Sequence, residues 1–319
     1  MLSLIQNEWM KIFKRGGTYV MIGILLLITT IVGGFIKYQD SKGTVPNNEN
    51  WKQGLQVQID SYKKNIDEMG ESIPVNTKEY LEREIALNEY RIDHNLSPNG
   101  DYSIWGFVND ASQIIAFVGL FTIIIAAGIV ASEFNWGTIK LLLIRPIHRG
   151  KILLSKYLTV LLFGLFLLIL LFVFSSGLGL LLFGMPESSV PYLNYNDGKV
   201  TEQSMLLHLI IYYGLNSIDM LMLATMAFMI SAAFRNSSLA IGLSLFLFFM
   251  GGQITQIIAM KYDWAKYILF ANTNLLQYFE GTPIVSGMTI SFSVMMLLVY
   301  FILFQAVAFY VFKKRDVAA

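Results

Sequence analysis

Residues 131–157 constrain the fold most, because this charged stretch lies between two apolar runs that are each long enough to cross a membrane. Its sequence is ASEFNWGTIKLLLIRPIHRGKILLSKY. One acidic and five basic side chains cannot reside in hydrocarbon, so the stretch must emerge at one face of the bilayer. By the positive-inside rule, five Lys and Arg residues in one loop predict that this face is cytoplasmic.

The composition places the chain among membrane proteins. Of its 319 residues, 55% are apolar and 14% are charged, and the formal net charge is +1. Six apolar runs are long enough to form spanning helices, which predicts an all-α polytopic membrane protein with six transmembrane helices. The chain has no cysteine, which excludes a disulfide framework and thiolate metal sites.

Lys and Arg residues divide unequally between the two sides of the predicted bilayer. The N-terminus, the 131–157 loop, the turn at Arg235 and the C-terminal tail carry twelve, whereas the two short opposite loops carry three. This asymmetry predicts that both termini are cytoplasmic. The predicted segments are, in order, a cytoplasmic amphipathic interfacial helix (1–16), span one (17–36), an extracellular helical hairpin (37–103), span two (104–132), a cytoplasmic loop (133–156), span three (157–184), an extracellular loop (185–204), span four (205–234), a cytoplasmic turn (235–238), span five (239–260), an extracellular loop (261–286), span six (287–312) and a cytoplasmic tail (313–319).

Two segments outside the spans have apolar faces. Trp9 and Phe13 lie on one face of the N-terminal segment, with the charged residues largely on other faces. This pattern favours a helix lying on the cytoplasmic membrane surface over an ordinary basic flank of the first span. Residues 268–279 are apolar but Asn-rich and too short to cross the bilayer, which predicts a re-entrant or interfacial helix.

Asp219 is a carboxylate well inside a predicted span, with Asn216 on the same helix. An ionised Asp at the bilayer centre costs about 2.5–3.5 kcal/mol on insertion scales, so it must face protein or water. Asn216 and Asp219 therefore form a candidate intramembrane polar site that contacts a substrate or an ion. A hydrogen-bonded acid that holds two helices together explains the same residues equally well.

The sequence lacks the motifs of nucleotide and hydrolytic chemistry. It contains no G-x-x-x-x-G-K-[ST], H-E-x-x-H or G-x-S-x-G, and its three histidines are far apart. We therefore expect that the chain is not an enzyme and binds no cofactor or metal of its own.

The basic loop contains a candidate docking surface for a soluble protein. An apolar patch at residues 138–144 is followed by a proline, which stops any helix, and is surrounded by basic side chains. The positive-inside rule accounts for the arginines, but it does not account for Glu133, Trp136 or Gly137. The residues of this candidate surface are Glu133, Trp136, Gly137, Thr138, Lys140, Arg145, Pro146, Arg149 and Lys151.

The stretch EFNWGTIKLLLIRPIHRGKILLSKY, placed between spans two and three of a six-span chain, resembles the permease subunits of ABC-2 type transporters. More narrowly, it is similar to the bacitracin-resistance type of permease from Gram-positive bacteria. The resemblance covers the whole topology and is most specific over 133–156. The long insert between spans one and two is more elaborate than in the simplest members of that family.

The resemblance implies a division of labour between chains. The candidate surface then couples the permease to a cytoplasmic ABC ATPase dimer that binds ATP and Mg²⁺, the N-terminal helix lies along the inner face of a bacterial plasma membrane, and a re-entrant element precedes the last span. A second permease chain, identical or paralogous, and membrane lipid are the other expected partners, whereas nucleic acid is not. The expected function is export of an amphiphile such as an antimicrobial peptide or a lipid-like molecule.

Other classes of function stay open. An ion-extruding permease, for example for sodium, fits the same topology, as does a membrane sensor or immunity protein that transports nothing. A stand-alone secondary transporter is disfavoured by the lack of an evident inverted repeat, and a lipid-modifying enzyme requires a cluster of acids or histidines at one membrane face.

Overall fold

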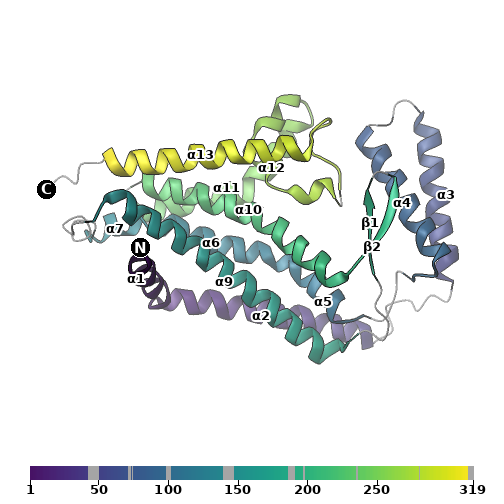
Figure 1. Ribbon diagram of the computed structural model, residues 1–319, viewed down its shortest axis with the longest axis horizontal. Helices are drawn as coiled ribbons and strands as arrows, with labels where there is room; N and C mark the ends of the chain where they lie inside the picture. The colour runs from purple at the N-terminus through teal and green to yellow at the C-terminus, as the bar shows by residue number, and fades with distance from the viewer. Residues whose placement is uncertain are drawn as a thin grey trace.

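A computed structural model shows a helical bundle with a small lobe at one end (Figure 1). Within the residues that it describes, six helices are long and apolar enough to cross a membrane, which confirms an all-α polytopic fold. They are α2 (Gly16–Ser41), the composite helix Ile104–Asn135, α9 (Arg149–Phe183), α10 (Met205–Ala233), α11 (Ser237–Ala259) and α13 (Ile290–Lys314). The described residues are 1–41, 50–70, 73, 75–97, 102–138, 147–185, 191–196, 198–234, 236–279 and 281–314.

The second and fourth spans form the centre of the bundle. In their most apolar parts 78% and 61% of the residues are buried, whereas the corresponding value is 17% for α2, α11 and α13. Val118 and Phe121 from the second span and Ala224 and Phe228 from α10 belong to one continuous core. The outer helices therefore keep broad apolar faces for lipid or for another protein chain.

The second span, predicted at 104–132, is present over Ile104–Asn135 but is interrupted. It consists of α5 (Ile104–Ala111), a 3-10 turn η2 (Ser112–Ile114), α6 (Ile115–Gly128) and α7 (Ala131–Asn135). At the break before α7, the hydroxyl oxygen of Ser231 accepts hydrogen bonds from the backbone N–H groups of Val130 (3.2 Å) and Ala131 (3.1 Å). Because these donors are satisfied, the helix can change course inside the bundle at little cost.

The third span begins eight residues earlier than expected. The predicted loop ran to residue 156, but α9 starts at Arg149, so Arg149 and Lys151 belong to its first turn. Leu, Lys and Arg, which favour helix, make up about half of residues 149–183, and the chain contains no proline between Pro146 and Phe183 that would break the helix. With 35 residues and a rise of about 1.5 Å each, α9 extends well beyond a hydrocarbon layer of about 30 Å.

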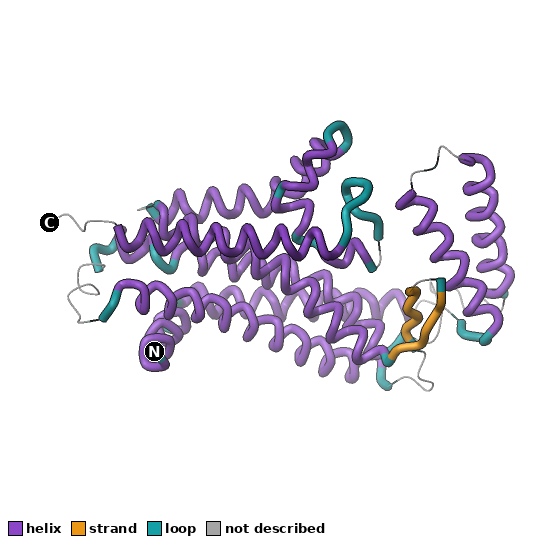
Figure 2. Tube along the Cα trace, turned by 45° about the horizontal axis from the view of Figure 1, so that its top comes forward, coloured by secondary structure: helices purple, strands orange, loops and turns teal. Residues whose placement is uncertain are grey.

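A lobe formed by two distant segments stands at the end of the bundle opposite to both termini (Figures 1 and 2). The predicted helical hairpin is present as α3 (Trp51–Met69) and α4 (Val75–Asp93), which pack together. The loop predicted at 185–204 instead contains an antiparallel hairpin, β1 (Tyr192–Asn196) and β2 (Lys199–Gln203), that packs on α4. The phenol of Tyr90 donates to Glu202 Oε1 at 3.2 Å.

Between α11 and α13 the chain makes three short helical turns, and the last two occupy residues 268–279, where the sequence predicted one re-entrant or interfacial helix. The turns are η3 (Asp263–Tyr267), α12 (Leu269–Asn272) and η4 (Leu275–Tyr278). The buried Asn272 amide organises them: its Nδ2 donates to the carbonyl oxygens of Lys266 (2.8 Å) and Ile268 (2.9 Å), and its Oδ1 accepts from Ser293 of α13 (2.8 Å). Backbone groups left over by the irregular chain are thereby satisfied.

Gly251 is where this segment meets α11, and its replacement by Ala is expected to destabilise the fold. A Cβ at this position lies 2.3 Å from Cζ of Phe270, too close for any real contact. Overpacking of this kind costs about 1–3 kcal/mol. The matched control is Gly252→Ala, because nothing lies within 4 Å of a Cβ there. Thermal unfolding in detergent measures the difference, and equal melting temperatures for the two variants contradict this packing.

Candidate functional site

Four charged side chains meet at the end of the bundle that holds α1 (Leu2–Phe13), α7, the start of α9 and the last turn of α13, which we call the basic end. Lys156 Nζ lies 2.7 Å from Glu8 Oε2 and 3.0 Å from Glu133 Oε1. Lys11 Nζ lies 2.9 Å from Glu8 Oε1 and 3.0 Å from Glu133 Oε1. These four residues, the charge cluster, join α1, α7 and α9 through alternating charges.

The charge cluster is mostly withdrawn from solvent. The Lys156 side chain is 1% exposed, those of Glu8 and Glu133 are 6% and 8% exposed, and that of Lys11 is 38% exposed. Burial lowers the pKa of Lys11, but hydrogen bonds and charges from Glu8 and Glu133 outweigh it, so that the pKa is raised above 10.5. Two carboxylates and two ammonium groups balance, which is the condition under which buried charges are tolerated.

Aromatic packing fixes α1 on the same helix that carries Lys156. Trp9 makes an edge contact with the ring of Phe166 at 5.9 Å between centroids, and Phe13 contacts Phe163 at 6.2 Å. The elbow between α1 and α2 is closed by Thr18, whose hydroxyl donates to the carbonyl of Ile12 at 2.6 Å. The two predicted interfacial aromatics therefore pack partly against α9, while Leu2 and Met10 remain exposed.

The chain leaves the charge cluster through residues 136–138, which we call the exit segment. The hydroxyl of Thr138 donates to Glu133 Oε2. Trp136 is 64% exposed, and the Arg15 guanidinium lies over its indole ring at 5.2 Å from the ring centroid. Gly137 has a φ of +69°, a conformation that a side chain would strain. The exit segment thus presents Trp136 outward from a base that Glu133 anchors.

The structure separates the predicted surface residues into four groups, of which Arg149 and Lys151 are the last. Glu133 is buried in the charge cluster, which corrects its placement on an accessible surface. Trp136, Gly137 and Thr138 form the exit segment. Three further residues, Lys140, Arg145 and Pro146, lie outside the described residues.

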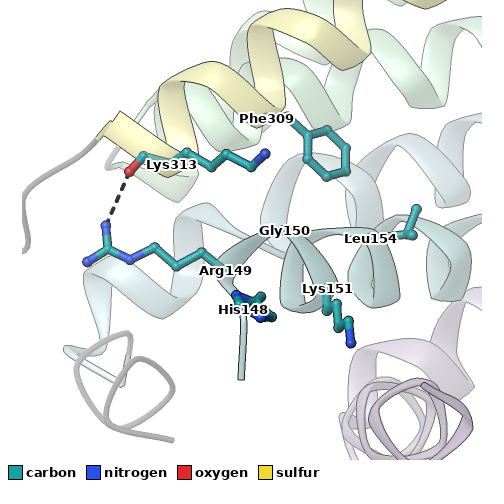
Figure 3. A pocket seen from close by; sticks show the side chains of 7 residues that line it. All are labelled: His148, Arg149, Gly150, Lys151, Leu154, Phe309 and Lys313. Atoms are coloured by element: carbon teal, nitrogen blue, oxygen red, sulfur yellow. Dashed lines mark hydrogen bonds between the residues drawn. The ribbon is translucent and has the colours of Figure 1, made fainter. Parts of the chain in front are cut away.

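Arg149 and Lys151 lie in the first turn of α9. They line a groove of about 550 Å³ between the first turn of α9 and the last turn of α13 (Figure 3). Arg149 Nη1 donates to the carbonyl oxygen of Lys313 at 3.3 Å, which ties the start of α9 to the end of α13. Because the carbonyl end of a helix carries partial negative charge, this contact favours the arginine.

The two predicted intramembrane polar residues, Asn216 and Asp219, lie on α10, which carries no member of the charge cluster. Asp219 on α10 makes a side-chain hydrogen bond with Thr273, in the segment between α12 and η4. Thr273 is buried, and Asn216 is partly exposed one helical turn before Asp219. Asp219 therefore joins α10 to the irregular segment before the last span.

Sequence reasoning missed three members of the charge cluster: Glu8, Lys11 and Lys156. A signal was present for two of them, because Glu8 precedes Trp9 on the short helix and Lys156 stands at the start of an otherwise apolar run. Charges at such positions require partners. Many charged residues lie at this end of the bundle. The packing of α1, α7 and α9 decides which of them become ion-pair partners.

The six spanning helices and the charged basic end define the class: this is a multi-pass membrane protein. The chain belongs to the family described as "Protein of unknown function (DUF2705)", whose model matches residues 86–318. It is 53% identical over 321 residues to the uncharacterized protein YhcI of Bacillus subtilis (strain 168), with both chains covered completely. It is 31% identical over 224 residues to the uncharacterized membrane protein YdbK of the same organism, which covers 70% of this chain and 87% of that relative.

Proposed function

We propose that this chain is the membrane-spanning permease subunit of an ABC-2 type exporter. The basic end faces the cytoplasm, where the exit segment and the basic residues after it receive a separate ATPase. ATP and Mg²⁺ bind to that partner, and this chain contributes no nucleotide chemistry. The cargo is an amphiphile, either an antimicrobial peptide or a lipid-like molecule, and it leaves the cell along the interface between two permease chains.

The charge cluster is the observation that supports this proposal most strongly. A surface segment transmits force only if its base is fixed to the helices that must move. Glu133 lies three residues before Trp136, and its carboxylate is bound by Lys156 of α9 and Lys11 of α1. A displacement of the exit segment therefore acts on the third span and on the interfacial helix together.

The proposed cycle is a shift between two populations. Two permease chains, identical or paralogous, exchange between inward-facing and outward-facing arrangements, and ATP binding by the attached ATPases favours one of them. ATP binding can favour one arrangement only if the ATPase contacts the two arrangements differently. In this proposal, that contact is made at the exit segment. The mostly apolar spans suit an amphiphilic cargo better than a polar one.

One observation favours a second candidate, the extrusion of an ion such as sodium by the same ATP-driven arrangement. Asp219 and Thr273 place a carboxylate and a hydroxyl together between α10 and the irregular segment. Transport assays in proteoliposomes separate the two cargoes: Asp219→Asn abolishes ion efflux if the ion is the cargo, and leaves amphiphile export measurable if Asp219 only joins two helices.

Affinity purification from the bacterial membrane tests the docking role. We expect the tagged chain to retain an ATPase that carries a P-loop. Trp136→Glu and Arg145→Glu are each expected to lower the recovery of this ATPase at least tenfold, because each introduces a negative charge at the proposed contact. Lys14→Glu is the matched control, because it reverses a charge on the same membrane face outside the exit segment. Equal recovery with all three variants contradicts the assignment, as does site-specific labelling of position 145 from outside the cell.

A further inference from the structure

An apolar groove of about 550 Å³ lies between α1 and α9 and shares no lining residue with the basic groove beside α13. We call it the α1–α9 groove. α1 contributes Ile5, Gln6, Trp9 and Met10, and α9 contributes four apolar side chains between residues 162 and 169. Sites for small ligands are concave, mostly apolar and roughly 300–1,000 Å³ in volume, with a few polar groups that orient the ligand. The α1–α9 groove has the size and the lining of such a site.

The lining of the α1–α9 groove carries no charge. Gln6 is polar, the other lining side chains are apolar or aromatic, and no charged residue in the described part of the chain belongs to the lining. A charged group inside the groove would lose its hydration without gaining a counter-charge. Gln6 is exposed, and its amide can donate and accept hydrogen bonds. The groove therefore suits an occupant that is mostly hydrocarbon and that offers Gln6 one uncharged polar group.

The α1–α9 groove is open on the side of α9 and closed where α1 crosses it. Leu165 and Ile169 line the groove from a spanning helix and are 51% and 54% exposed, so the described chain leaves this side of α9 uncovered. Trp9 meets Phe166 in an edge contact, and α1 lies across the direction of α9 (Figures 1 and 2). A straight helix of a second chain that runs along α9 would collide with α1, whereas a flexible hydrocarbon chain can end there.

A peptide fits the α1–α9 groove poorly. An extended peptide would bring N–H and C=O groups against apolar side chains, and Gln6 could satisfy few of them. A helical peptide satisfies its own backbone but meets α1 in the same way as a helix of a second chain. A hydrocarbon chain carries no such polar groups and gains free energy from each methylene that it buries. Of the two classes of amphiphile named above, the groove favours the lipid-like molecule over the antimicrobial peptide.

We propose that the α1–α9 groove holds the hydrocarbon chain of the exported molecule, and that this molecule is lipid-like. The chain enters from the leaflet at the basic end and lies against Leu165 and Ile169, and an uncharged ester, amide or hydroxyl group lies beside Gln6. This inference rests on the proposed export function and narrows its cargo to one chemical class. The groove is then a loading site that the cargo occupies before it reaches the path between two permease chains.

The position of the α1–α9 groove links cargo binding to the charge cluster. Trp9 lines the groove, and its neighbour Glu8 contacts Lys156 of α9 at 2.7 Å. Lys156 in turn contacts Glu133, the anchor of the exit segment, at 3.0 Å. A change in the spacing of α1 and α9 on loading therefore reaches the exit segment through two ion pairs.

Photolabelling of the full-length chain in phosphatidylcholine vesicles tests the proposal. The probe is a monoacylglycerol with a diazirine in the middle of its acyl chain, an uncharged amphiphile with a single hydrocarbon chain. We expect labelling of Met10 and Leu165 that unlabelled monoacylglycerol competes away. Leu165→Trp is expected to lower the labelling of Met10 about tenfold, because the added ring overpacks the groove.

The matched control is Val173→Trp. Val173 is 61% exposed on the same helix and does not line the groove, so the same ring is added outside the site. We expect full labelling of Met10 in this variant. The melting temperature in detergent shows whether both variants are folded, and the exposed Leu165 and Val173 side chains leave room for a larger residue. Gln6→Leu provides a further test that adds no bulk, and it is expected to weaken competition by monoacylglycerol relative to the alkane of the same length.

Four results overturn the proposal. Labelling that does not saturate and is equal at Ile302, an exposed residue of α13, shows contact with bulk lipid only. Equal competition by an uncharged, end-blocked leucine-rich peptide shows that the groove does not select a hydrocarbon chain. Unchanged labelling in Leu165→Trp places the probe elsewhere. Disulfide-linked dimers of a Met10→Cys variant show that a second copy fills the groove, since the chain has no cysteine of its own.

The labelling assay separates this inference from the docking role. The vesicles contain no ATPase, so a failed copurification leaves the labelling of the groove unaffected. Loss of saturable labelling, with the ATPase still copurifying, removes the loading site and leaves the permease assignment in place.

Discussion

Replacing Lys156 by Met is expected to destabilise the folded chain by about 3–5 kcal/mol, the cost of leaving buried charges without their partner. The ammonium of Lys156 contacts one oxygen of Glu8 and one of Glu133, and both carboxylates are nearly inaccessible to water. After its removal only Lys11 opposes two negative charges. Thermal unfolding in detergent and protease resistance of the α1–α2 region measure the loss.

Lys11→Met is the matched control for this prediction. It removes a lysine that contacts the same two carboxylates, but the Lys11 side chain is 38% exposed, so water screens much of its effect. We expect a loss of about 1 kcal/mol or less. Equal destabilisation by the two changes would show that Lys156 is not the central charge of the cluster.

Neutralising the three buried members of the charge cluster separates an effect on stability from an effect on coupling to the ATPase. In the combined variant Glu8→Gln, Glu133→Gln and Lys156→Met, no uncompensated charge stays buried, and much of the stability is expected to return. If the cluster transmits movement from the exit segment, this stable variant still binds the ATPase, but the ATPase no longer responds to cargo. Full stimulation in the combined variant contradicts the transmitting role.

Cysteine at position 253 is expected to link two copies of the chain covalently. Gln253 projects from the exposed face of α11, roughly 9 Å from its C-terminal end, where a lipid-facing amide is unfavourable. In the proposed pair of identical permease chains, contact with the same residue of the second copy across a twofold axis would satisfy it, because an isologous contact brings identical residues together. Since the chain has no cysteine of its own, Gln253→Cys reports this contact alone.

The control for crosslinking is Met295→Cys. Met295 lies on α13 at a comparable distance from the same end of the bundle and is 56% exposed, and the neighbouring exposed side chains Val294 and Leu298 are apolar. Oxidation of membranes followed by non-reducing electrophoresis is expected to convert most of the Gln253→Cys protein to dimer and little of the Met295→Cys protein. Dimer formation at 295 alone assigns the pairing face to α13 instead.

Several features of the site depended on the order of residues along one helix and could be anticipated. The amphipathic pattern of residues 1–16 predicted a helix, which α1 (Leu2–Phe13) forms, and the apolar run before residue 183 predicted the helix that carries Lys156. The groove beside Arg149 could not be anticipated, because the end of α13 that completes it lies 164 residues further along the chain. Glu133 was assigned to a surface for the same reason, since both of its lysine partners come from other helices.

The sequence by itself determined the number of spans, their approximate limits and the existence of a helical insert, because the cost of placing polar backbone or charge in hydrocarbon is a local property of about twenty residues. Only the tertiary structure decided which charges are neutralised, where the second span breaks and how the β-hairpin joins the lobe. Those outcomes depend on contacts between helices. In a bilayer such contacts rest on close packing and hydrogen bonds, which leave no periodic trace in the sequence.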